Sequence, residues 1–436
     1  MRVLLVAYEF PPSPSPQSLR WAYMSREMAM AGLDMEIVAP RLPATQACIP
    51  ECGGYSVRRT FPGPFMATVA WLRSLSADAG APRPQRAQDN AVDADLSGGG
   101  ATLNWKGRLV ERLQAFVGAP LFPDIRAEWN PWARSAIRDR LGRGDIDVMV
   151  TSHEPASVLT LGREAMRVGV KWVADLGDPV QAPYTPARWK RRAFRLERQV
   201  CRRADHVTVT SEPTRELLIR RHDVEPGRIS VVTQGFDQRA VQATSNESGG
   251  DRLELLYTGS LYGFRRPEAL LEAVARTPGT RLSIASRHMP ASVAAWQKRH
   301  PGSVRLLGPL SHPDALALQR RADVLVDLGN DQAEQVPGKF YEYLGAMRPI
   351  LHIGPPGSVA AALLSNARRG WTCGADCCEI SDLLERLVVL KAEGRLDAGL
   401  DLGPSVVAEH SWESLSRSMI GILRSVAGRQ PVELRS

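Results

Sequence analysis

The chain lacks long apolar runs and has few cysteines, and both absences exclude whole classes of protein. Its opening apolar run, Val3–Ala7, ends before Glu9 and a proline cluster. That run is far shorter than a signal-peptide core or the roughly 20 residues of a membrane span. Six cysteines in 436 residues cannot build a disulfide framework, and they lack the histidines or paired spacing of a zinc site. We therefore expect a cytoplasmic protein.

Acidic residues are outnumbered by basic ones. The chain has 55 lysines and arginines against 47 aspartates and glutamates, which gives a formal charge of +8. Such an excess favours an anionic partner. Charge alone leaves open whether that partner is nucleic acid, a phosphorylated substrate or an anionic lipid surface.

Two Asp-x-Asp pairs resemble metal-binding motifs, but neither lies where a metal site is expected. Asp93 and Asp95 fall in the Ala-, Pro-, Gly- and Asp-rich stretch 77–101, which we expect to be a disordered insertion because it cannot build a core. Asp145 and Asp147 open a predicted strand, whereas ligands of α/β sheets bind beyond the carboxyl ends. We expect no metal and no other cofactor.

Short β-branched runs alternate with helical patterns over residues 1–237. Runs of this kind are typical of buried parallel strands, and the helices between them supply the crossovers. The predicted strands are Val3–Ala7, Met35–Ala39, Ile146–Val150, Val170–Ala174, His206–Thr210 and Ile229–Val232, and the predicted helices are Gln17–Ala31, Pro155–Val168, Pro186–Arg203 and Pro213–His222. Together they predict one doubly wound domain.

A second domain follows a polar, Gly- and Ser-rich stretch, 238–251, which has no apolar periodicity and is predicted to be a linker. Over 252–403 the alternation resumes, with strands at Leu253–Thr258, Arg281–Ala285, Val304–Leu307, Val324–Asp327 and Pro349–Ile353. A helix in 404–436 is expected to cross back to the first domain. The predicted class is α/β, with two Rossmann-like doubly wound domains facing across a cleft.

The most informative segment runs from 331 to 350. It leaves a strand, turns at Pro337-Gly338 and enters a helix whose free N–H groups and dipole favour an anion. Lys339 adds a positive charge in the first turn, as a diphosphate site requires. Glu342 lies one turn further and could accept hydrogen bonds from two ribose hydroxyls. The alternative is a capped surface helix with solvated charges.

Here a family resemblance becomes specific. Glu334 and Glu342 are separated by seven residues, and this spacing resembles the Glu-x7-Glu pattern of family-4 retaining glycosyltransferases, which have the GT-B fold. The run Val336-Pro-Gly-Lys-Phe-Tyr-Glu-Tyr-Leu-Gly-Ala, followed by Arg348-Pro-Ile-Leu, is similar to the donor-site helix of bacterial cell-surface polysaccharide glycosyltransferases. The resemblance covers most of the chain, including Thr233-Gln-Gly-Phe-Asp237.

The resemblance implies roles for the donor side. Glu334 would contact donor-sugar hydroxyls, Glu342 the ribose, and Gly338 and Lys339 the diphosphate. The run Leu256-Tyr-Thr-Gly-Ser-Leu-Tyr-Gly-Phe-Arg-Arg-Pro is similar to the first strand and phosphate loop of the family's C-terminal domain. Its donor-binding candidates are Gly259, Arg265 and Arg266, while Ser260 stands where many relatives carry arginine.

On the acceptor side, Trp172-Val-Ala-Asp-Leu-Gly-Asp-Pro179 resembles the subgroup's aspartate-x-x-aspartate-proline loop. Many relatives carry a histidine there. Asp175 or Asp178 would have to supply its polar contact, or either could simply cap the next helix. His153 leaves a neighbouring strand and could donate a hydrogen bond, act as a base, or be structural. The catalytic candidates are then Asp178 and His153, with Glu334 and Lys339.

The resemblance implies an enzyme that moves a hexose-type sugar from a UDP- or GDP-linked donor to an oligosaccharide acceptor with anomeric retention. We expect a lipid-linked acceptor and a role in exopolysaccharide, capsule or O-antigen assembly. Transfer is expected to be metal-independent, because cations and a helix start can stabilise the leaving diphosphate. Two alternatives are a GT-B nucleotide-sugar epimerase and a catalytically silent GT-B partner subunit.

The predicted helix Pro186–Arg203 is strongly basic. Its only acid is Glu197, and its cations are Arg188, Lys190, Arg191, Arg192, Arg195, Arg198, Arg202 and Arg203. This pattern suits an anionic membrane surface, with a solvated helix face as the alternative. No recognition motif accompanies the charge, so we expect no nucleic-acid partner but possible peripheral attachment to the inner face of the plasma membrane.

Overall fold

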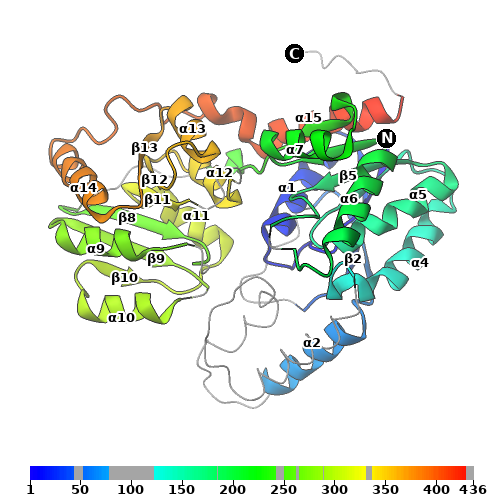
Figure 1. Cartoon of the computed structure of the whole chain (residues 1–436), viewed down its shortest axis with the longest axis horizontal. Helices are drawn as coiled ribbons and strands as arrows, with labels where there is room; N and C mark the ends of the chain where they lie inside the picture. Colours follow the sequence, from blue (N-terminus) through cyan, green and yellow to red (C-terminus); the bar gives the residue numbers. More distant parts are fainter. Residues whose placement is uncertain are drawn as a thin grey trace. The chain divides into compact units, whose positions relative to one another are not determined.

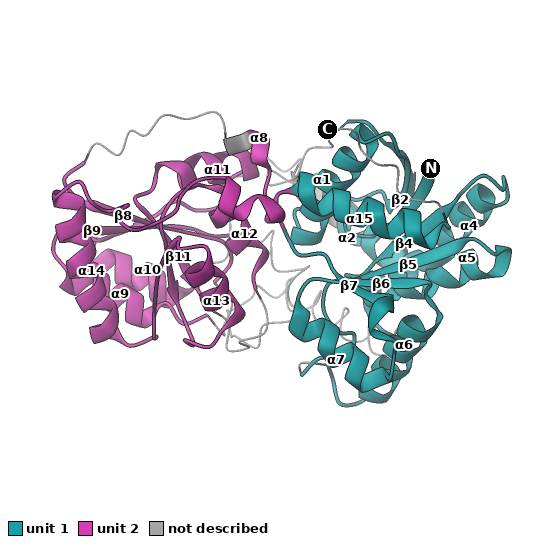
Figure 2. Ribbon diagram, turned by 90° about the horizontal axis from the view of Figure 1, so that it is seen from above, with its two compact units in different colours: residues 1–91, 103–234, 412–436 teal, residues 92–102, 235–411 magenta. Residues whose placement is uncertain are grey.

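The apolar runs form two separate parallel sheets with helices on both faces (Figures 1 and 2). The computed structural model describes residues 1–43, 53–77, 122–183, 185–241, 250–261, 265–287, 289–329 and 336–428. Unit 1 contains the described residues among 1–91, 103–234 and 412–436, and unit 2 contains those among 235–411. The predicted insertion lies outside the described residues, apart from Ala77, which ends a helix.

Unit 1 is built on a seven-stranded sheet in the order β3-β2-β1-β4-β5-β6-β7, with every pairing parallel. The strands are β1 (Arg2–Val6), β2 (Asp34–Pro40), β3 (Ser56–Thr60), β4 (Val148–Ser152), β5 (Lys171–Leu176), β6 (His206–Val209) and β7 (Ile229–Val231). The helices are α1 (Pro16–Met30), α2 (Pro64–Ala77), η2 (Ile125–Trp129), α4 (Asn130–Leu141), η3 (Ala156–Leu161), α5 (Gly162–Val168), α6 (Lys190–Arg203), α7 (Glu212–His222), η4 (Pro226–Arg228) and α15 (Trp412–Val426).

Successive side chains of each strand point to opposite faces of the sheet, so the core of unit 1 is divided between the two faces. On β1, Leu4 and Val6 pack with the apolar sides of α4, α5, α6 and α7. Val3 and Leu5 face the other way and pack with α1 and α15. Figure 1 shows α15, the last described helix, beside α1, and the rings of Tyr23 and Trp412 stack there at 6.1 Å.

Unit 2 has a six-stranded parallel sheet in the order β10-β9-β8-β11-β12-β13. The strands are β8 (Leu253–Thr258), β9 (Thr280–Ala285), β10 (Val304–Leu306), β11 (Val324–Leu328), β12 (Ile350–Ile353) and β13 (Gly370–Cys373). The helices are α8 (Gln238–Val241), α9 (Glu268–Arg276), α10 (Ala291–Arg299), α11 (His312–Arg321), α12 (Gly338–Gly345), α13 (Val359–Asn366), α14 (Cys377–Ala392) and η5 (Ser405–His410). The apolar sides of α12 and α13 share one cluster, and those of α9 and α14 share another.

The predicted class, α/β with two Rossmann-like domains, is confirmed. Both sheets follow the order 3-2-1-4-5-6 that is typical of doubly wound folds. Three details differ from the sequence prediction. The basic helix begins at Lys190, after a turn at Pro186 to Trp189. The predicted linker opens with a short helix, α8. Strands β3 and β13 were not predicted, because neither has a buried apolar run.

Within the described residues, none of the helices combines the length and the apolar character that crossing a bilayer requires.

Candidate functional site

The start of α12 is the centre of the candidate donor site in unit 2. Pro337 precedes the helix in an extended conformation, and no side chain among the described residues caps its first N–H groups. The side chains of Phe340, Tyr343 and Leu344 are buried beneath the helix, whereas Lys339 and Glu342 are partly exposed. A helix start with unused donors and an adjacent lysine favours an anion.

The ammonium group of Lys339 lies in an unusual environment. Its Nζ is 3.7 Å from the ring centroid of Tyr257 and 3.7 Å from Oδ1 of Asp327, and it has no hydrogen-bond partner among the described residues. Burial and the nearby Arg265 guanidinium lower the pKa of Lys339 well below its ordinary value, with Asp327 opposing them. A bound anion would supply the missing partner.

Gly259 makes room for this lysine. It follows β8 with φ of +125°, in the region that favours glycine, and a Cβ there would lie 3.1 Å from Cδ of Lys339. Arg265 is buried close by, where its Nη1 donates to Tyr257 Oη at 3.2 Å and to the Ser260 carbonyl at 3.1 Å. The structure therefore brings Gly259, Arg265 and Lys339 together.

The other predicted donor residues are placed differently. Arg266 is exposed, whereas Arg265 is buried. Glu334 lies outside the described residues. Gly338 opens α12 directly before Lys339.

Glu342 lies one turn along α12, on the same side as Lys339. Its Oε1 is 3.8 Å from Nδ1 of His312, the first residue of α11. Burial raises the pKa of the Glu342 carboxyl, although His312 opposes the shift. The carboxylate is within reach of solvent, at 16 % exposure of its side chain, and can accept hydrogen bonds from a ligand.

The sequence analysis missed two polar residues beneath Lys339. Asp327 of β11 and His352 of β12 are register partners in otherwise apolar strands, and His352 Nδ1 lies 2.8 Å from Asp327 Oδ2. The Nε2 atom of His352 lies 3.0 Å from Oγ of Ser358, the N-cap of α13. Their signal in the sequence was a single polar residue inside each of two buried strands.

In unit 1 the two predicted aspartates differ, since Asp175 lies inside β5 and Asp178 lies in the loop after it. Asp175 is fully buried, and its carboxylate accepts hydrogen bonds from Arg20, Gln17 and Thr208. Its oxygens are thus occupied within the protein. Asp178, three residues later, is partly exposed. Of the two, Asp178 is the one that a ligand can reach.

His153 lies at the end of β4 and is buried. Its backbone N–H donates to the Asp175 carbonyl at 2.8 Å, and its Nδ1 has no partner among the described residues. Burial lowers the pKa of His153 to about 4. The ring is therefore neutral near pH 7 and only weakly basic, and the weak basicity favours a hydrogen-bonding or structural role over that of a base.

Glu154, the next residue, was not singled out by the sequence analysis. Its φ of +67° is rare for a non-glycine residue, and its carboxylate lies beside Gly177. Burial, Asp178 and Glu9 raise the pKa of Glu154 to about 8, against the effect of Arg126. A glutamate that is partly protonated near neutral pH can donate as well as accept a hydrogen bond.

Of the two Asp-x-Asp pairs, Asp145 and Asp147 have a structural role. Asp145 is paired with Arg2 and Arg140, and Asp147 accepts from the backbone N–H of Arg2 at 2.8 Å. Both precede β4, as predicted, and so lie away from the carboxyl ends of the strands. The other pair, Asp93 and Asp95, lies outside the described residues.

Comparison with solved structures agrees with this architecture. HepE of Anabaena, solved in complex with UDP, matches with a TM-score of 0.63 at 10 % identity, covering 98 % of this chain and 100 % of that one. WaaG, described as a glycosyltransferase involved in lipopolysaccharide biosynthesis, matches with a TM-score of 0.59 at 12 % identity, covering 97 % and 99 %. At such identities the likeness shows the fold alone, which is GT-B.

Sequence relatives extend the comparison. D-inositol 3-phosphate glycosyltransferases of Mycobacterium bovis and Mycobacterium tuberculosis are 23 % identical over 253 residues, which is 54 % of this chain. The chain spans about half the length of these curated relatives, 52 %. A family model described as "Glycosyltransferase Family 4" matches residues 18–239, half of the chain. The chain therefore belongs to glycosyltransferase family 4.

Proposed function

We propose that this chain is a glycosyltransferase that moves a hexose-type sugar from a nucleotide-sugar donor, held mainly by unit 2, to an oligosaccharide acceptor. The observation that carries the proposal is Lys339, whose buried ammonium group has no hydrogen-bond partner among the described residues and lies at the start of α12, where none of those residues caps the first N–H groups. An ammonium group that is buried without hydrogen-bond acceptors is costly unless a ligand supplies them. The HepE complexes with UDP and UDP-glucose make UDP the first donor nucleotide to test, with GDP the second.

The proposed donor assignment follows the charges of unit 2. Lys339, Arg265 and the first N–H groups of α12 receive the diphosphate, and Glu342 accepts hydrogen bonds from the ribose. As the bond from the sugar's anomeric carbon to the diphosphate oxygen breaks, negative charge grows on the diphosphate. These preorganised cations and dipoles then stabilise it without a metal ion.

We propose retention by front-face transfer. The acceptor hydroxyl attacks the oxocarbenium-like anomeric carbon from the side that the diphosphate leaves, and the departing phosphate oxygen takes the hydroxyl proton. Glu334 and Asp178 would contact donor-sugar or acceptor hydroxyls. His153 would contribute as a neutral hydrogen-bonding group, because burial lowers its pKa to about 4. This mechanism is supported by the family resemblance. Front-face transfer also requires no covalent nucleophile from the protein.

A nucleotide-release assay tests the activity. UDP-sugars and GDP-mannose are each incubated with the protein, with and without a lipid-linked oligosaccharide acceptor, and released nucleoside diphosphate is measured. Release that requires the acceptor supports transfer. Release or inversion of the donor without acceptor would point to an epimerase, and no turnover of any donor that binds would point to a silent partner subunit.

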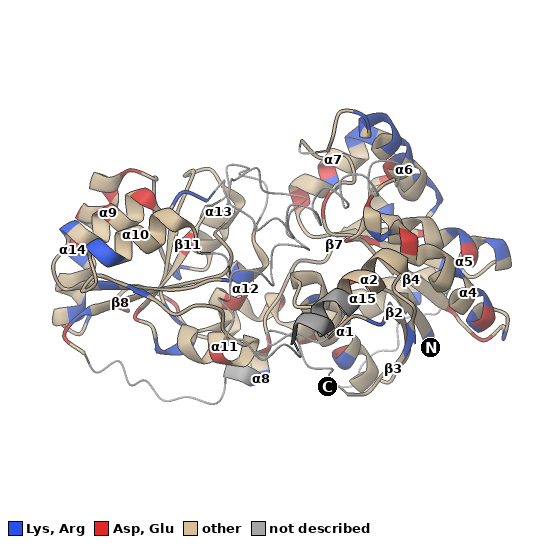
Figure 3. Cartoon of the chain, turned by 90° about the horizontal axis from the view of Figure 1, so that it is seen from below, with Lys and Arg blue, Asp and Glu red and all other residues tan. Residues whose placement is uncertain are grey.

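We also propose that the acceptor is lipid-linked, in exopolysaccharide, capsule or O-antigen assembly, and that α6 holds the protein at the cytoplasmic face of an anionic membrane. Figure 3 shows Lys and Arg gathered on α6. The helix's only acid, Glu197, is fully buried and bound to Arg221 and His222, each at 2.7 Å. All charged side chains on the exposed side of α6 are therefore basic.

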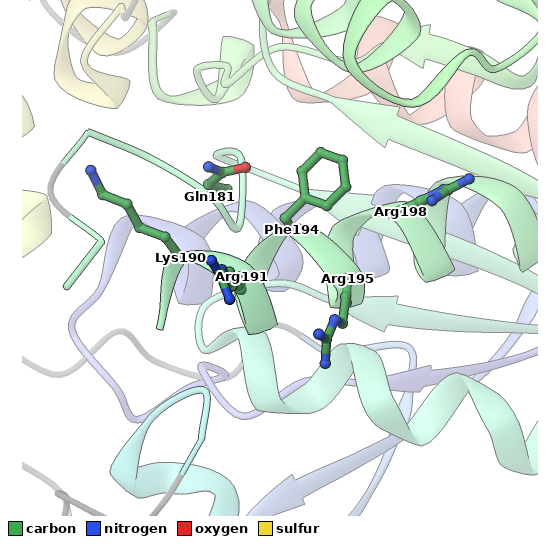
Figure 4. A pocket seen from close by; sticks show the side chains of 6 residues that line it. All are labelled: Gln181, Lys190, Arg191, Phe194, Arg195 and Arg198. Carbon is green, nitrogen blue, oxygen red and sulfur yellow. The ribbon is translucent and has the colours of Figure 1, made fainter. Parts of the chain in front are cut away.

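The same face carries a hollow of about 360 Å³ (Figure 4). It is lined by Gln181, Lys190, Arg191, Phe194, Arg195 and Arg198. One aromatic ring among four cations is a composition that suits an anionic interface, where the ring contacts acyl chains and the cations contact headgroups.

Replacing Arg191, Arg192 and Arg195 with glutamine should release the protein from anionic vesicles. Each cation near such a surface contributes about 1 kcal/mol, so the three together should change partitioning roughly 100-fold at low salt. Co-sedimentation with phosphatidylserine-containing vesicles measures this. A control triple, Arg305, Arg321 and Arg386 to glutamine, removes the same charge from exposed positions of unit 2. Equal binding by both triples would exclude α6.

Glu342→Ala should weaken nucleotide binding more than it slows saturated turnover. The ribose hydroxyls keep the same contacts with Glu342 in the ground state and the transition state. Losing these hydrogen bonds therefore weakens the binding of both states equally. We expect donor and free nucleoside diphosphate to bind about 1 to 3 kcal/mol more weakly, the range for a lost hydrogen bond to a charged group. Calorimetry measures the affinity. Glu385→Ala, an exposed position on α14, serves as the control; unchanged affinity in a folded Glu342→Ala protein would remove the ribose assignment.

A further inference from the structure

Two polar side chains lie in the interior of unit 2 where apolar ones are expected. Asp327 and His352 are 0 % and 1 % exposed and sit opposite each other on β11 and β12. Their neighbours in both strands are valine, leucine and isoleucine. Burying such a pair is costly unless all of its polar atoms are used.

The pair is only partly satisfied. His352 bridges Asp327 Oδ2, at 2.8 Å, and Ser358 Oγ, at 3.0 Å, so both ring nitrogens are used. Oδ1 of Asp327 has no hydrogen-bond partner among the described residues and lies 3.7 Å from Nζ of Lys339, which also has none. Two opposite charges thus face each other just beyond hydrogen-bond distance.

The positive charges near Asp327 explain why a carboxylate is needed at this position. Lys339 and Arg265 are both cationic and both lie against Tyr257, at 3.7 Å from its ring and 3.2 Å from its hydroxyl respectively. Without Asp327, two neighbouring cations would share a poorly hydrated site. Glu342, another carboxylate near Lys339, lies toward His312.

We propose that Asp327 is the internal counter-anion of Lys339, oriented by His352 and Ser358, and that it keeps the ammonium group positioned at the start of α12 until the donor diphosphate arrives. The inference rests on the proposed role of Lys339 in donor binding and adds three positioning residues to it. Asp327 and His352 act through Lys339 and do not touch the donor.

The expected readout is the pH dependence of nucleotide binding. Lys339 faces Arg265, Tyr257, Tyr343, Asp327 and Glu342. Burial and Arg265 lower its pKa, and Asp327 opposes them. Because the diphosphate binds the charged amine, affinity should fall as pH rises through the pKa of free Lys339. Removing the Asp327 charge lowers that pKa further, so the fall should begin at lower pH.

The test is calorimetric titration of the full chain with UDP, and separately GDP, from about pH 6 to about pH 9. Asp327→Asn should move the fall in affinity by about one pH unit toward acid and cost about tenfold in affinity at the alkaline end. Asp323→Asn is the matched control, since Asp323 precedes the same strand and pairs with Lys391 instead. It should reproduce the wild-type curve.

His352→Gln and Ser358→Ala keep the Asp327 charge but loosen its orientation, so each should show a smaller shift in the same direction. Asp327→Glu should restore much of the wild-type profile. Melting curves verify that each variant is folded. Identical pH profiles for wild type, Asp327→Asn and His352→Gln would overturn the inference while leaving donor binding by Lys339 intact. Failure of the wild type to bind either nucleotide would overturn the donor role itself, and this inference with it.

Discussion

Lys339→Ala should lower turnover by roughly two to three orders of magnitude, on the scale of losing one preorganised electrostatic group. The ammonium group meets charge that grows as the diphosphate departs, so its contribution is larger in the transition state than in the bound donor. Saturation kinetics should therefore show most of the loss in kcat. Lys298→Ala, an exposed lysine on α10, is the matched control.

Lys339→Met separates the charge from the packing. Methionine keeps an unbranched stem beside Gly259 and Tyr257 but carries no charge. Turnover should fall as far as in Lys339→Ala. The melting temperature should fall modestly, because the buried Asp327 carboxylate loses the cation that faces it. Near-normal kcat in a folded Lys339→Met protein would contradict the electrostatic role.

Asp175→Asn should destabilise unit 1 by about 3 to 5 kcal/mol. The substitution leaves the Arg20 guanidinium buried beside a neutral amide, and both partners are fully inaccessible in the native protein. An uncompensated buried charge is among the few single changes with so large an effect. Scanning calorimetry, which can separate the transitions of two units, measures the change.

Asp178→Asn is the contrasting variant, in the loop that follows β5. Asp178 is partly exposed, so its stability should change by less than about 1 kcal/mol. Its turnover should fall, because this carboxylate is assigned to the reacting sugars. The reverse pattern, with a stable but inactive Asp175→Asn and a destabilised but active Asp178→Asn, would exchange the two roles.

The fold was largely readable from the sequence, because buried parallel strands are continuous apolar runs. β8 was predicted with its bounds, Leu253–Thr258, unchanged. β3 was missed because Ser56–Thr60 contains two arginines and no apolar run. Periodicity cannot detect an edge strand whose side chains are only partly buried.

The candidate site was readable only in part. Lys339 stood out because a cation in the first turn of a helix favours an anion, and Glu342 because of its place one turn further and its seven-residue separation from Glu334. Asp327 and His352 form a pair through strand register, which requires knowing that β11 and β12 are neighbours. Glu154 depends on a backbone conformation and on burial, neither of which a single sequence displays.

The most direct test of donor binding on α12 is hydrogen exchange of the peptide covering 336–345, measured with and without saturating UDP or GDP. No side chain among the described residues caps the first N–H groups of α12, so these groups should exchange rapidly in the free protein and slow on binding. At nucleotide concentrations that only just saturate the wild type, slowing should be clearly smaller in Glu342→Ala and somewhat smaller in Lys339→Met. A nucleotide that binds, yet leaves exchange of this peptide unchanged, would contradict the account.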